Sequence, residues 1–102
     1  MEIDSELIRA ETARQSGNEG KARVCARRAA GLAARDFLAR HAIRLDNESA
    51  YEALQILVTF PGLDPDLKEA ALHLTARVNE DFKLPGDVDL IGEARKLIGG
   101  LS

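Results

Sequence analysis

The sequence contains no tryptophan, one tyrosine and three phenylalanines, so aromatic side chains cannot fill most of a hydrophobic core. It has one cysteine, Cys25, which excludes an internal disulfide and a metal site built from several cysteines. A lone cysteine fits a reducing compartment, and we expect a cytoplasmic protein. The acidic N-terminal segment lacks the apolar core of a signal peptide. The apolar runs fall far short of the roughly 18 residues that a membrane span needs.

Neither sign of charge dominates, because 14 basic and 17 acidic residues leave a net charge of only −3. The total charge therefore gives no reason to infer nucleic-acid binding, although charge can still be segregated locally. The 102 residues are the length of one domain, which we place at 1–102. Apolar residues make up 45% of the chain, mainly as alanine and leucine, and this composition favours closely packed helices over sheets.

The spacing of apolar residues indicates helices throughout, and no segment shows the period-two alternation of a half-buried strand. The expected helices are Ser5–Ser16, Glu19–Arg40, Ala50–Thr59, Pro65–Glu80, and a last one from Asp87 or Asp89 to Ile98. Asn18 is the expected N-cap of the second helix, Ser49 and Glu52 form a capping box, and Asp64 caps the fourth helix before Pro65. Gly99–Gly100 is expected to end the last helix.

Connections of a few residues usually join antiparallel neighbours. The predicted fold is therefore all-α: an antiparallel up-and-down four-helix bundle with a short fifth C-terminal helix.

The second helix has apolar residues on two sides. One broad face consists mostly of small residues: Ala22, Cys25, Ala26, Ala29, Leu32, Ala33 and Phe37. Val24, Gly31 and Leu38 form a second stripe, spaced seven residues apart. We expect this stripe to contact either another helix of the same chain or a second subunit, and we name its three residues as candidate dimer contacts.

The second helix carries five basic residues, namely Lys21, Arg23, Arg27, Arg28 and Arg35. One interpretation is a solvated face that pairs with acidic neighbours such as Glu6 and Glu11 of the first helix. The other is a binding surface for a phosphate-bearing ligand, RNA or an acidic partner protein. No aromatic residues lie among the arginines, so stacking of bases from a single strand is poorly supported.

The sequence provides no catalytic constellation, metal site or cofactor motif. His41 ends the second helix and His73 lies beside the apolar stripe of the fourth, and neither has a cysteine or glutamate at ligand spacing. Cys25 falls on the apolar face of its helix, where a small buried side chain is expected.

The order of these elements resembles HEPN domains, which are small helical bundles. The resemblance rests on the segment 26–38, ARRAAGLAARDFL, on Ala53-Leu54-x-x-Leu57 before a Pro-Gly break, and on Glu93-Ala94-Arg95 in the last helix. Gly31 stands where many family members have glutamate. The resemblance implies a homodimer and pairing with a small nucleotidyltransferase, often as a toxin–antitoxin module.

Active HEPN domains are metal-independent ribonucleases with an Arg-x4-6-His motif late in the bundle. Here no histidine follows Arg77, and the spacing of Arg35 and His41 matches in the wrong helix. The favoured interpretation is therefore a non-catalytic HEPN-like protein that dimerises and binds a partner protein or a nucleotide or RNA ligand. The alternatives are a ribonuclease that uses Arg35 and His41, or Arg77, and an unrelated helical adaptor.

Overall fold

The computed structural model describes residues 2–45, 49–76 and 88–101, and these ranges contain five α-helices and no β-strand. The helices are α1 (Glu2–Gln15), α2 (Glu19–Arg40), α3 (Ala50–Val58), α4 (Pro65–Thr75) and α5 (Leu90–Leu101). The prediction of an all-α protein with five helices is confirmed for this part of the chain. Among the described residues, no helix is both long enough and apolar enough to cross a membrane.

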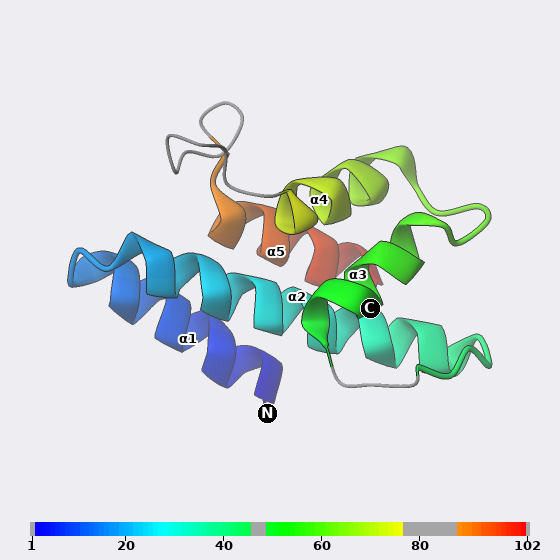
Figure 1. The fold of residues 1–102 in the computed structure, drawn as a ribbon, viewed down its shortest axis with the longest axis horizontal. Coiled ribbons are helices and arrows are strands. Elements are labelled where there is room, and N and C mark those ends of the chain that lie inside the picture. The colour runs from blue at the N-terminus through cyan, green and yellow to red at the C-terminus, as the bar shows by residue number, and fades with distance from the viewer. Residues whose placement is uncertain (1, 46–48, 77–87, 102) are drawn as a thin grey trace.

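Helix α2 lies at the centre of the molecule and contacts each of the other four helices. In Figure 1, α1, α2, α5 and α4 follow one another from the bottom of the view to the top, and α3 lies to the right between α2 and α4. Helix α5 packs on both α2 and α4, and five of its residues are buried. Helix α5 is the expected fifth C-terminal helix, and it contributes to the core.

The predicted starts of α2, α3 and α4 are confirmed by their caps, whereas α1 begins at Glu2 and not at Ser5. Asn18 and Ser49 each accept a hydrogen bond from the backbone N–H three residues later, at 3.1 Å and 3.2 Å. Asp64 accepts one from the N–H two residues later, at 2.8 Å, and Pro65 follows in the first turn. These side chains accept hydrogen bonds from N–H groups that have no partner within the helix. Such capping residues are recognisable in the sequence, so the helix starts can be predicted.

The helix ends differ more from the prediction. Helix α4 ends at Thr75, and Ala76 is extended, whereas we expected helix to continue to Glu80. One reason is tertiary, since Arg27 of α2 donates from Nε to the carbonyl of Leu74 at 2.7 Å. This bond satisfies a carbonyl left open by the end of the helix. Residues 77–80 and the alternative start at Asp87 lie outside the described residues.

The last helix passes through the two glycines that were expected to stop it. Leu101 is 4% exposed, and its carbonyl accepts a hydrogen bond from Nη2 of Arg40 at 2.6 Å. Gly100 lies directly against Leu67 of α4, where a Cβ atom would come within 2.8 Å of Cδ1. The absence of a side chain at Gly100 thus allows α4 and α5 to lie close together. Tertiary packing here outweighs the low helix propensity of glycine.

One core joins all five helices, and its composition changes along the chain. From α1 and α2 it takes mainly alanines, together with Cys25 and a few leucines. The fully buried large side chains are Leu38, Leu54, Leu57, Leu74, Leu90, Ile91 and Leu97. Because the α1–α2 contact buries small residues, these two helices approach each other closely, as the predicted small-residue face implies.

Gly31 marks the closest approach of α2 to α3. A Cβ atom built on Gly31 would lie 2.6 Å from the backbone Cα of Ala50. Because a backbone atom occupies this place, α3 must move away before any side chain fits there. The glycine therefore permits the contact between the two helices.

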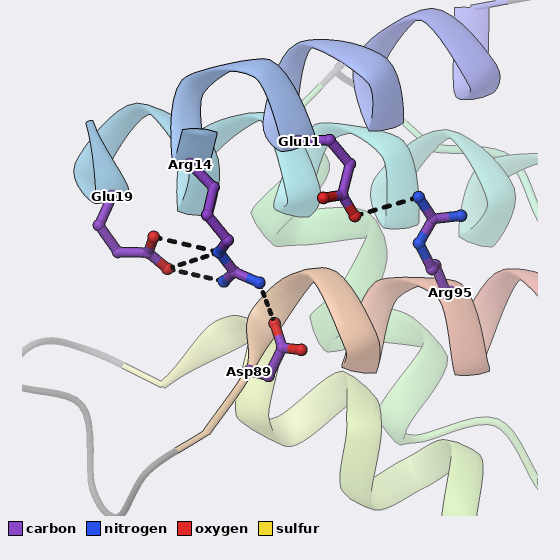
Figure 2. Close-up of polar contacts among 5 residues, drawn as sticks. All are labelled: Glu11, Arg14, Glu19, Asp89 and Arg95. Carbon is purple, nitrogen blue, oxygen red and sulfur yellow. Dashed lines mark hydrogen bonds and ion pairs between the residues drawn. The ribbon is translucent and has the colours of Figure 1, made fainter. Parts of the chain in front are cut away.

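Ion pairs tie α1 to the start of α2 and to α5 (Figure 2). Arg14 of α1 pairs with Glu19 at 2.6 Å and with Asp89 at 2.7 Å. Glu11 of α1 pairs with Arg95 of α5 at 3.1 Å. Since α1 has few direct contacts with α5, these bridges form much of the link between them.

Replacing Gly31 by alanine tests the close approach of α2 to α3. An alanine within a helix normally gains about 1 kcal/mol over glycine, but overpacking costs about 1–3 kcal/mol. We therefore expect Gly31→Ala to lose roughly 1–2 kcal/mol of unfolding free energy in urea titrations, since the backbone of Ala50 must move. The matched control is Gly20→Ala in the same helix, where the nearest atom lies at 3.8 Å and no loss is expected. An equal rise in stability in both variants would contradict the packing argument.

Replacing Arg14 by glutamine tests the ion pairs through their pH dependence. Hydrogen bonds from Arg14 hold the pKa of Glu19 and the pKa of Asp89 below their ordinary values. In acid the unfolded chain therefore takes up protons before the folded chain does. The stability from these pairs is present above about pH 4–5 and is lost as the pH falls through the lowered pKa values.

We thus expect thermal melts between about pH 7 and pH 3 to fall more steeply for the wild type than for Arg14→Gln. Both carboxylates are substantially exposed, so the difference at neutral pH is at most about 1 kcal/mol. Two parallel pH profiles would show that the pairs contribute nothing to stability.

Candidate anion-binding groove between the first two helices

A hollow of about 850 Å³ lies between α1 and α2, and Ala50 of α3 also lines it. We call it the α1–α2 groove. Its lining comprises Glu2, Ser5, Glu6 and Arg9 of α1, and Val24, Arg27, Arg28, Gly31, Leu32 and Arg35 of α2. Four arginines face two glutamates there, so the groove carries a net positive charge in a protein whose total charge is negative.

Helical spacing explains how these side chains come together. On α1, Glu2, Ser5 and Arg9 recur every three or four residues and share one face. On α2, Arg28 and Arg35 are seven residues apart and likewise share a face. The small core residues bring the two helices close, so cations from both helices converge on one hollow.

The structure brings together three of the five cations that the sequence singled out. Arg27, Arg28 and Arg35 line the groove. Lys21 lines a neighbouring hollow of about 220 Å³ that shares Arg9 with the groove. Arg23 lines neither hollow and lies near Glu19, whose pKa it helps to lower.

Sequence reasoning missed Arg9. It stands on the opposite wall from the α2 arginines, and its side chain is 63% exposed. The signal was present in the sequence, because Arg9 lies on the polar face of the first helix. Its position opposite the second helix could not be predicted without knowing which faces of the two helices pack together.

Not every arginine of the groove is equally available. Arg27 donates from Nε to the carbonyl of Leu74, so this side chain helps to hold the end of α4. Arg28 is exposed, and Arg35 is half-buried. Arg28 and Arg9, on opposite walls, are thus the two exposed guanidinium groups of the groove.

Glu6 has a buried carboxylate oxygen without a hydrogen-bond partner in the described residues. Its Oε1 accepts from Nη1 of Arg9 at 3.1 Å, and its side chain is only 14% exposed. Its Oε2 is buried and accepts no hydrogen bond from any residue that the structure describes. Leaving a buried acceptor unpaired costs about 1–3 kcal/mol. Glu6 therefore opposes both the stability of the groove and its attraction for anions.

The two glutamates named as possible partners of the basic face do not pair with its cations. Glu6 pairs with Arg9 of its own helix, and Glu11 pairs with Arg95 of α5 (Figure 2). Both glutamates lie on α1, but their side chains reach other partners.

The stripe of Val24, Gly31 and Leu38 serves the chain's own packing. Leu38 is fully buried in the core, and Gly31 lies against Ala50 of α3. Only Val24 is exposed, at 43% of its surface. Of the two partners considered for this stripe, a helix of the same chain is therefore the one observed. Leu38 is buried within this chain, whereas Val24 and Gly31 line the groove, and dimerisation stays a prediction.

The histidines lie apart from the groove. His41 is the C-cap of α2, and its Nδ1 lies 2.8 Å from the carbonyl oxygen of Phe37. Its ring packs on Phe37 and Phe60, away from Arg35, which lines the groove. His73 of α4 lies 3.1 Å from Glu93 of α5 and joins these two helices.

Arg35 lines the groove and His41 does not, and the ribonuclease alternative that uses this pair stays a prediction. Arg77 lies outside the described residues. Within the described ranges, no cluster of three or more histidines, cysteines, aspartates and glutamates is arranged to hold a metal ion.

Comparison of the chain with protein-family models, with curated proteins and with solved structures finds no match in any of the three. The geometry of the groove is thus the basis on which a function can be proposed.

Labelling of Cys25 tests its predicted burial. The residue is 2% exposed on the core side of α2. A thiol in this position reacts only when the protein opens, so we expect labelling by a disulfide reagent to be at least about a hundredfold slower in buffer than in urea. A Cys25→Ala/Ser16→Cys variant, with its thiol at an exposed position, is the control for reagent access. Equal rates for Cys25 in buffer and in urea would contradict the core placement.

Proposed function

We propose that the protein is a non-catalytic binding protein whose α1–α2 groove holds an anionic group of a partner protein or of a nucleotide or RNA ligand. The single observation behind this proposal is the convergence of four arginines, from both walls, on one hollow. Such segregation of positive charge in a chain of net charge −3 favours a specific site over general attraction to anions.

Guanidinium groups suit this role because of their chemistry. An arginine stays charged at any physiological pH and presents planar N–H donors that match two oxygens of a phosphate or carboxylate. Arg9 and Arg28 stand on opposite walls, so an anion between them would receive donors from both helices. A hollow also concentrates the field of its cations more than a flat surface does.

The HEPN interpretation extends this proposal. It includes an antiparallel four-helix bundle, a homodimer and a nucleotidyltransferase-type partner. It rests on the sequence resemblance, and the comparisons lend it no support. Sedimentation velocity of the purified protein tests the dimer directly, and a strict monomer at high concentration would exclude it.

Anisotropy titrations with two labelled probes test the groove: a 12-nucleotide oligouridylate and a 12-residue polyglutamate. We expect at least one probe to bind, with an affinity that falls as salt rises. Arg9→Gln and Arg28→Gln should each weaken binding about fivefold to tenfold, since a contact to a charged group is worth about 1.5–3 kcal/mol before solvent screening. Glu6→Gln should strengthen binding, because it removes a negative charge from the groove.

The matched control is Arg44→Gln, which removes an exposed arginine that does not line the groove. It should leave the affinity almost unchanged. If neither probe binds, or if Arg44→Gln weakens binding as much as Arg28→Gln does, the proposed function is wrong. The oligouridylate should remain intact after incubation. Cleavage that disappears in His41→Ala would instead support the ribonuclease interpretation.

A further inference from the structure

Two of the three large hydrophobic side chains that are exposed within the described residues lie beside the arginines. Ile8 is 66% exposed and lines the smaller hollow, and Val24 is 43% exposed and lines the α1–α2 groove. The third, Leu72, stands on α4. Because the two hollows share Arg9, the apolar and basic side chains form one continuous surface along the α1–α2 seam.

This surface is long enough to receive a helix. On α2, its lining residues run from Lys21 to Arg35, and the fourteen helical rises between them cover about 21 Å along the axis. A partner helix of about fourteen residues covers that length. Laid between α1 and α2, it would place one apolar stripe over Ile8 and Val24 and flanking residues near the cations.

From this combination we infer that the α1–α2 seam binds an acidic amphipathic helix of a partner protein. The inference rests on the proposed function, because it assigns the occupant of the same groove. Aliphatic anchors beside arginines fit the leucines and glutamates of such a helix, by burial and by charge complementarity.

The same features argue against two other occupants. A single strand of RNA gains affinity by stacking its bases on aromatic side chains, and no aromatic residue lines either hollow. A second copy joined by a two-fold contact through this seam would place one positively charged groove against another, which is unfavourable.

Two synthetic 18-residue peptides of identical composition, made of leucine, glutamate and alanine, test this inference by fluorescence anisotropy. In one peptide the leucines form a single helical stripe flanked by glutamates, and in the other they are spread around the helix. We expect the striped peptide to bind at least about tenfold more tightly than the spread peptide and than polyglutamate. Burial of one or two aliphatic side chains contributes that much affinity.

The matched variants separate the apolar contribution from the charge. Ile8→Ser should weaken the striped peptide about tenfold and leave polyglutamate binding unchanged. Leu72→Ser removes a similarly exposed side chain from α4 and should change neither affinity. Arg28→Gln should weaken both probes.

The outcomes distinguish this inference from the proposed function on which it rests. If polyglutamate binds and the striped peptide binds no more tightly, the helix partner is wrong and the anion-binding groove stands. If the oligouridylate binds more tightly than the striped peptide, the occupant is a nucleic acid and the inference fails. If no probe binds, both proposals fail.

Discussion

Helix α2 contacts every other helix of the protein, and small side chains on several of its sides make this possible. Alanines let α1 and α5 approach, and Gly31 leaves room for the backbone of α3 at Ala50. A chain with few aromatic residues can build a closed core in this way, since close contact between backbones replaces bulky side chains. The positions of the other four helices therefore depend on the absence of large side chains at these contacts on α2 as well as on the side chains that are present.

The arginines of α2 serve two tasks, and Arg27 takes part in both, because it bonds to α4 and also lines the groove. Arg27 and Arg40 donate to carbonyls near the ends of α4 and α5, where a cation also meets the negative end of the helix dipole. These bonds join segments distant in sequence, and the bond from Arg27 lies at the end of α4. Arg28 is exposed to the groove instead. A run of basic residues that looks uniform in the sequence is thus divided between holding the fold and forming a surface.

The helix starts could be predicted because they depend on neighbouring residues, as the caps at Asn18, Ser49 and Asp64 illustrate. The ends of α4 and α5 were harder, because they depend on contacts between helices. Gly99 and Gly100 suggest a stop, yet α5 continues to the buried Leu101. The groove, too, could be predicted only in part, because it depends on contacts between helices. The cations of α2 were visible in its sequence pattern, whereas Arg9 belongs to the site only because of how α1 packs.

The distribution of charge explains why the total composition was uninformative about binding. The groove gathers four arginines against two glutamates, so the rest of the chain carries a larger negative charge than the net value of −3 suggests. An anion approaching elsewhere meets on average a repulsive field, while the groove attracts it at distances within about one Debye length, near 8–10 Å in physiological salt. Negative net charge therefore sharpens the preference for this one site. In the same way, an acidic partner would be steered towards the seam before its apolar side chains make contact.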